Sequence, residues 1–237
     1  MIELLLFFLG GAVASFTQLV ADRLPQGETI LGRSHCVKCK KTLRPMHLIP
    51  VVSFLLLSGR CSFCKAKIPI SHLSYELCIG FLFTILYLLF TIVNLPQLLF
   101  VYVVLTISLP ILLIDSKEHI IPDELVFLLI IAGLLLNSAH IPQLIGSAVL
   151  TTFIMWVPYY VTGGKGMGMG DVKLAFGIGA ILPFAYAFSA LYIAFLTGGL
   201  ISVILIVMRK KSLKSAIPFG PFMVLGLVCV LIYYLKT

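Results

Sequence analysis

The chain has 237 residues, of which 60% are hydrophobic and only 11% are charged, and its mean hydropathy is +1.13. Soluble domains are typically about 45–50% apolar, so this composition excludes an ordinary soluble domain and indicates a polytopic membrane protein. The net charge of +8 is better explained by basic cytoplasmic loops than by a nucleic-acid partner, and we predict no nucleic-acid binding.

The first apolar segment, residues 2–21, is long enough to cross a bilayer, and the only charge near its start is Glu3. A secretory signal peptide would begin with basic residues, so we expect a retained transmembrane helix. Pro183 is expected to divide the long apolar run 172–208 into two helices. The predicted spans are residues 2–21, 73–93, 97–114, 124–139, 144–162, 172–187, 189–208 and 217–235. The sequence therefore predicts an all-α polytopic protein with about eight transmembrane helices.

The connections between these spans differ in their content of Lys and Arg. All but Lys236 of the 17 basic residues fall in alternate connections, which begin with the long loop 22–72. The connections near 94–96, 140–143 and 183–188 contain none. The positive-inside rule assigns the basic side to the cytoplasm, which places both termini outside. We therefore predict a multi-pass protein of the cell membrane.

The loop 22–72 contains two CxxC pairs, Cys36 with Cys39 and Cys61 with Cys64. Four thiolates supplied by two tight turns are typical of tetrahedral zinc, and a reducing cytoplasm disfavours disulfides. A redox-active CxxC is the alternative, but it would need only one copy. Because four ligands leave no open position, we predict a structural zinc knuckle between the first two spans.

An acidic motif, residues 115–123, joins the third and fourth spans. Asp115 lies at the C-terminal end of a predicted helix, where the helix dipole disfavours an anion, so a working role is favoured over a salt bridge to Lys117. Asp123 follows Pro122 at the start of the next helix, where a carboxylate is an ordinary N-cap. We predict a catalytic role for Asp115 and a supporting one for Asp123.

A glycine-rich segment, residues 163–170, leads directly to Asp171. Glycine allows positive φ and a close approach of the backbone to a ligand. A Walker-type phosphate loop is excluded because Lys165 is not followed by Ser or Thr. A flexible connector with an N-capping Asp remains the alternative. Gly168, Gly170 and the following basic residue, Lys173, are predicted to support Asp171.

The predicted topology places Asp115 and Asp171 on the same membrane face. Peptide hydrolysis needs one carboxylate to deprotonate water and one acid to protonate the scissile carbonyl, and two Asp residues in one site readily share a proton. We therefore predict that these two residues are the catalytic pair of an aspartic peptidase. An ion-coupled transporter with intramembrane carboxylates is the alternative, although we find no convincing internal repeat that would favour it; a non-enzymatic assembly scaffold is the third.

Short motifs recur in a characteristic order along nearly the whole chain. They are residues 10–16, 23–25, 32–36, 48–50, 59–61, 75–76, 115–123 and 170–174. In this order and spacing the sequence resembles the type IV prepilin peptidase family. The resemblance implies a GxGD-type aspartic endopeptidase that removes a short basic leader from type IV prepilins or pseudopilins, cutting after a Gly just before the hydrophobic helix. The implied catalytic pair is Asp115 and Asp171.

The resemblance also implies a second activity in many family members. They methylate the new N-terminal amine with S-adenosylmethionine, an activity associated with the CxxC loop. The expected partners are prepilin or pseudopilin substrates and membrane lipid, and Glu76, Glu118 and Glu124 are candidate contacts for the basic leader. The predicted parts are a first transmembrane helix at 1–21, a zinc-binding loop and candidate methyltransferase region at 22–72, and a peptidase domain at 73–237.

Overall fold

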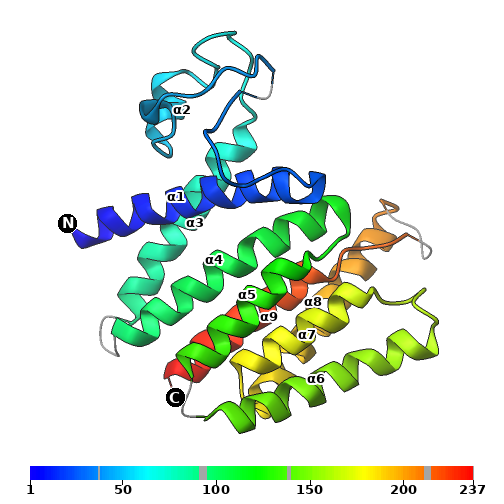
Figure 1. Ribbon diagram of the computed structural model, residues 1–237. Coiled ribbons are helices and arrows are strands. Elements are labelled where there is room, and N and C mark those ends of the chain that lie inside the picture. The colour runs from blue at the N-terminus through cyan, green and yellow to red at the C-terminus, as the bar shows by residue number, and fades with distance from the viewer. Residues whose placement is uncertain (37, 91–94, 138–139, 211–214, 237) are drawn as a thin grey trace. The chain divides into compact units, whose positions relative to one another are not determined.

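A computed structural model describes residues 1–36, 38–90, 95–137, 140–210 and 215–236 (Figure 1). Every regular element in these ranges is a helix, and the cysteine loop adds two isolated β-bridges. The elements are α1 (Ile2–Arg23), η1 (Leu24–Gln26), η2 (Pro45–His47), α2 (Val52–Leu56), α3 (Ile70–Phe90), α4 (Leu95–Glu118), α5 (Asp123–Leu136), α6 (Ile141–Val161), α7 (Met169–Ile181), α8 (Phe184–Val207) and α9 (Gly220–Lys236). The predicted all-α fold is confirmed.

Within the described ranges, five segments are long and apolar enough to cross a membrane: α1 together with η1, and α3, α4, α6 and α8. The other predicted spans coincide with α5, α7 and α9, which have 14, 13 and 17 residues. Pro183 separates α7 from α8, as expected. The chain is therefore a multi-pass membrane protein. Part of the predicted orientation rests on residue 94, Lys211 and Lys214, which lie outside the described residues.

The chain forms two compact units, Met1–Leu98 and Leu99–Thr237. In the first unit α1 packs closely along α3, and the buried contact on α1 is made by Gly10, Gly11 and Ala14. Small residues let helix backbones approach each other in a bilayer, where apolar burial gives little drive for association. The cysteine loop connects these two helices and carries η2 and α2.

In the second unit α7 packs between α5 and α6, and α8 packs against α9. The contacts of α7 leave no room for larger side chains. A Cβ on Gly133 of α5 would lie 2.5 Å from the carbonyl oxygen of Ala180, and a Cβ on Gly179 would lie 2.5 Å from Cα of Ala148 in α6. These close contacts bury most of α7 and fix the position of its first turn.

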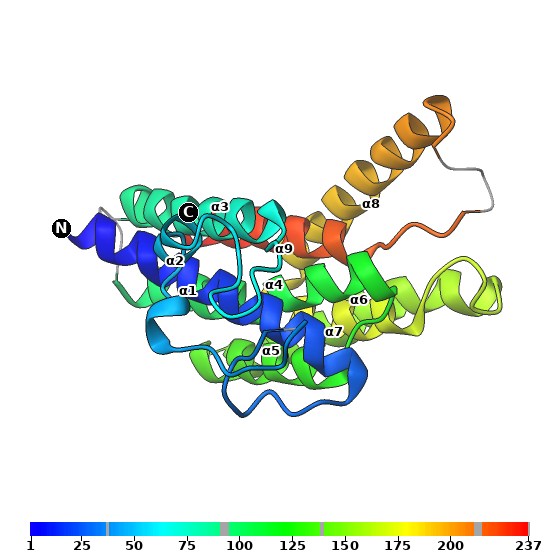
Figure 2. The ribbon, with the colours of Figure 1, turned by 90° about the horizontal axis from the view of Figure 1, so that it is seen from above.

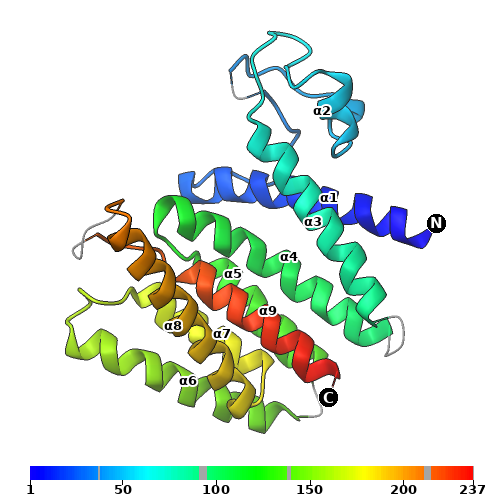
Figure 3. The same ribbon diagram turned by 180° about the vertical axis from the view of Figure 1, so that it is seen from behind.

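One end of the second unit brings together several helix termini. Figure 3 shows that α4 ends at this side and that α7 and α9 begin there. The first half of α8 is buried through Ala187, Ala190 and Ala194, whereas Figure 2 shows its second half extending away from α7 and α9, with Val203 and Val207 exposed. The acidic motif and the glycine-rich segment both belong to this end of the unit.

Candidate active site and cysteine cluster

Asp115 lies in the last turn of α4 and is only 5% exposed. Its Oδ2 atom accepts a hydrogen bond of 2.8 Å from the backbone N–H of Gly220, the first residue of α9. N–H groups in the first turn of a helix have no intrahelical acceptor, and the helix dipole is positive there. The carboxylate is disfavoured by the C-terminal end of its own helix, but it is stabilised by the N-terminal end of α9.

Gly220 is also required for steric reasons. A Cβ at this position would lie 2.8 Å from Oδ2 and 3.1 Å from Cγ of Asp115. Gly220 was not among the residues predicted from the sequence. A weak signal exists, because Pro221 follows it and proline favours the first turn of a helix. Nothing local, however, connects a helix start at residue 220 with a carboxylate 105 positions earlier in the chain.

Asp171 is the third residue of α7 and is 9% exposed. Its Oδ2 atom accepts a hydrogen bond of 3.2 Å from the backbone N–H of Gly168, which precedes the helix. In this half of a capping box, the side chain of the third helical residue reaches back to the N-cap backbone N–H. Gly168 is therefore the N-cap residue of α7, and the alternative that made Asp171 the N-cap of a flexible connector is wrong on this point. Gly170 packs against the acidic motif, because a Cβ there would lie 3.0 Å from Cβ of Ile121.

The structure brings Asp115 and Asp171 together at the same end of the second unit. Gly170, next to Asp171, packs against Ile121 of the acidic motif, and α7 contacts α9, whose first residue binds Asp115. Each carboxylate is also held at the N-terminal end of a different helix, Asp115 at α9 and Asp171 at α7. Two buried acids arranged in this way can share one proton.

Asp123 differs from the expectation for an N-cap. Pro122 occupies the N-cap position, Asp123 is the first helical residue of α5, and no side-chain capping bond is present there. Both oxygens of Asp123 instead accept hydrogen bonds of 2.8 Å from Nζ of Lys173 in α7. The two side chains are 68% and 45% exposed, so this ion pair is a surface connection between α5 and α7. Glu118 and Glu124 are also exposed near the same connection.

The carboxylate of Glu76, a predicted leader contact, is engaged within the first unit. Its Oε2 atom accepts a hydrogen bond of 2.7 Å from the backbone N–H of Val51, and Ser15 of α1 also hydrogen bonds with it. Val51 has a φ of +63°, which is unfavourable for a β-branched residue. Glu76 therefore helps to hold the cysteine loop against α1 and α3.

The four predicted metal ligands, Cys36, Cys39, Cys61 and Cys64, form one cluster. Their Sγ atoms all lie within 4.8 Å of one another, and those of Cys36 and Cys64 are 3.9 Å apart. Four zinc–sulfur bonds of about 2.3 Å in a tetrahedron place the sulfur atoms about 3.8 Å apart, close to the distance between Cys36 and Cys64. Backbone N–H groups of Cys64 and Phe63 lower the pKa of the Cys61 thiol to about 6. This favours the thiolate, the form that binds metal, at Cys61, whereas desolvation and the neighbouring cysteines raise the pKa of Cys64 to about 11.

The two CxxC turns are copies of one structural unit. In each turn the first Cys carbonyl accepts a hydrogen bond from the Lys that follows the second Cys, with lengths of 2.8 Å and 3.0 Å. These lysines, Lys40 and Lys65, have φ values of +56° and +57°. Each turn is closed by a matching antiparallel bridge, His35 with Thr42 and Arg60 with Lys67. This short repeat was not predicted, although it is visible in the sequence as equal spacing around the two CxxC pairs.

Two protein families match the two units of the chain one by one, and individual relatives match most of the chain. Residues 8–90 match the bacterial peptidase A24 N-terminal domain, and residues 98–203 match the type IV leader peptidase family. A prepilin leader peptidase/N-methyltransferase of Pseudomonas aeruginosa is 33% identical, over 83% of this chain and 70% of its own length. The chain belongs to the type IV leader peptidase family. A protein of the same name from Bacillus subtilis is 29% identical over 97% of this chain and 93% of its own length. No solved structure matches.

Membership of the leader peptidase family confirms the predicted resemblance, and these relatives give no support to the transporter alternative. The two matched regions meet close to the boundary of the compact units at Leu98 and Leu99. The predicted start of the peptidase domain at residue 73, in the first turn of α3, stays a prediction. The functions assigned to the three predicted parts stay predictions.

Proposed function

We propose that this protein is a membrane-embedded aspartic endopeptidase that removes the basic leader from type IV prepilins or pseudopilins at the cytoplasmic face of the cell membrane. One observation carries the proposal: two buried carboxylates, Asp115 and Asp171, are held at the N-terminal ends of two helices that contact each other, α9 and α7. The names of the relatives supply the substrate class.

The proposed mechanism uses the pair as one unit. One carboxylate takes a proton from water, and the other donates a proton to the scissile carbonyl. The backbone N–H groups of Gly220 and Gly168 hold one oxygen of each carboxylate, which leaves the second oxygen for water or peptide. The 13 residues of α7 rise only about 20 Å, against about 30 Å for the hydrocarbon core. A short α7 suits a substrate that is cut beside its own transmembrane helix.

Purified protein in proteoliposomes is expected to convert a full-length prepilin into mature pilin and free leader. Mass spectrometry of the products locates the cut, which we expect after a Gly at the junction of the leader and the apolar helix. An assembly scaffold or a transporter would leave the prepilin intact. Intact substrate in the presence of folded protein would therefore contradict the proposed function.

We further propose that the cysteine cluster holds one structural Zn²⁺ ion, which fixes the loop without taking part in hydrolysis. Metal analysis of purified protein is expected to give about one zinc per chain. Cys61→Ser should lose the metal and lower the melting temperature, whereas Cys78→Ser, at an exposed position of α3, should change neither. A metal-free wild-type protein with the same melting temperature as the Cys61 variant would contradict the assignment.

The methyl-transfer activity named in the relatives is proposed for a cleft of about 690 Å³ in the first unit. S-adenosylmethionine would supply an electrophilic methyl group there. Asp22 and Glu28 line the cleft and match the cationic groups of S-adenosylmethionine. Exposed Phe16 offers a ring on which the adenine of S-adenosylmethionine can stack. The buried Nε2 atom of Gln18, also in the lining, finds no acceptor among the described residues. The same mass spectra test this proposal, because a mature pilin unmodified in the presence of S-adenosylmethionine would contradict it.

A further inference from the structure

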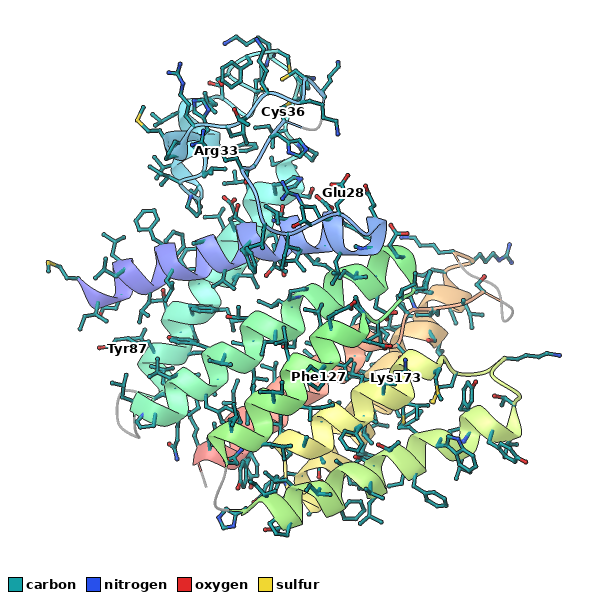
Figure 4. All side chains as sticks on the ribbon, viewed as in Figure 1. Glu28, Arg33, Cys36, Tyr87, Phe127 and Lys173 are labelled. Atoms are coloured by element: carbon teal, nitrogen blue, oxygen red, sulfur yellow. The ribbon has the colours of Figure 1, made fainter. Side chains whose placement is uncertain are left out.

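The second unit contains a groove that the proposed catalytic pair does not use. Its volume is about 440 Å³, and it lies between α5, α6 and α7. It is lined by Asp123, Val126, Phe127, Ile130, Thr152, Trp156, Met169, Val172, Lys173 and Phe176. Figure 4 shows Phe127 on α5 and Lys173 on the neighbouring α7. This volume falls within the roughly 300–1,000 Å³ that is usual for ligand sites.

The interior of the groove is apolar and its sides are firmly held. Val126 and Val172 are buried, whereas Phe127 is 62% and Trp156 is 38% exposed. The Trp156 ring is stacked on Tyr160 at 4.9 Å and is therefore fixed in orientation. The hydroxyl of Thr152 donates to the Ala148 carbonyl at 2.7 Å, so its hydrogen is not offered to the groove. An apolar segment is the occupant that such walls accept.

The rim of the groove is charged and lies next to the proposed active site. Asp123 and Lys173 form their ion pair at this rim, and exposed Glu124 follows directly on α5. Met169 and Val172 face the groove from the same first turn of α7 that carries Asp171. One helix turn thus has an apolar binding surface and a candidate catalytic carboxylate, and the opening carries the Asp123–Lys173 ion pair and the carboxylate of Glu124.

We propose that this groove receives the apolar helix of the substrate, while the basic leader lies beside Glu124 at the charged rim. The proposal rests on the proposed function, and it adds the surface that positions the substrate. Charge complementarity favours a substrate with a basic segment next to an apolar one over a lipid acyl chain, which has no such pattern. Because lipid is as apolar as a helix, burial alone discriminates little, and shape and the charged rim must provide the selectivity.

Site-specific photocrosslinking in the full-length membrane protein tests this surface. A photoreactive p-benzoylphenylalanine replaces Phe127 in one variant and Phe188, a 47% exposed position on α8, in the matched control. With full-length prepilin present, the variant at 127 is expected to give several-fold more prepilin adduct than the variant at 188. Equal adduct yields at both positions, or adducts of lipid alone at 127, would overturn the proposal.

Kinetics provide an independent measurement. Phe127→Ser should raise KM for full-length prepilin about threefold to tenfold without changing kcat, the effect expected for losing one helix–helix contact in lipid. Phe188→Ser should change neither constant. Unchanged KM in the Phe127 variant would overturn the groove. Cleavage by the wild-type protein is measured in parallel. Normal wild-type cleavage without a selective adduct would contradict only the binding role of the groove. Absence of wild-type cleavage would contradict the proposed function itself.

Discussion

Gly220→Ala is expected to lower the rate of leader removal about 100-fold while the protein stays folded. The added Cβ would lie 2.8 Å from Oδ2 of Asp115, so the carboxylate must rotate away from the N-terminal end of α9. Rotation of a short side chain costs the fold little, but a displacement of about 1 Å in a reacting group can cost about 100-fold in rate. The loss should therefore appear in kcat, with KM for prepilin unchanged.

Gly199→Ala is the matched control for this prediction. Gly199 lies within α8, and a Cβ there would meet nothing within 4 Å. This variant should cleave prepilin at the wild-type rate, and its melting temperature should be unchanged or slightly higher because alanine favours a helix. If Gly220→Ala cleaves as fast as Gly199→Ala, the position of the Asp115 carboxylate does not matter for the reaction.

Most of the helical architecture could be predicted because hydropathy acts locally. Apolar segments of spanning length must form helices in lipid, where every backbone polar group needs an internal partner. The break at Pro183 follows from a ring that cannot continue a helix. The shortness of α5 and α7 is also visible in the sequence, because α5 ends just before polar Asn137 and α7 ends two residues before Pro183.

The acidic residues of the candidate site could be found from sequence, but their partners could not. Asp115 stands out because a carboxylate at a helix C-terminus is unfavourable, and the compensating N–H of Gly220 is supplied by a distant part of the chain. Asp123 was misplaced because Pro122 takes the N-cap position and Lys173 in α7 binds the carboxylate. At both positions the partner of the carboxylate comes from a distant part of the chain, which the local sequence does not reveal.

The central claim is that Asp115 and Asp171 act as one unit in hydrolysis. Each residue is replaced by Asn, which keeps the shape of the side chain but removes its acid–base chemistry. Each single variant should lose at least about 1,000-fold in kcat, the scale of a positioned acid or base. Asp123→Asn breaks only an exposed ion pair and should lose far less. Circular dichroism and melting curves establish that all variants remain folded.

The most direct measurement is the rate of prepilin cleavage by Asp115→Asn, Asp171→Asn and the double variant in the same proteoliposomes. Residues that work as a unit show strongly non-additive losses, so the double variant is expected to be no slower than either single one. A single variant that still cleaves at nearly the wild-type rate, or a double variant whose loss equals the product of the two single losses, would contradict a shared site.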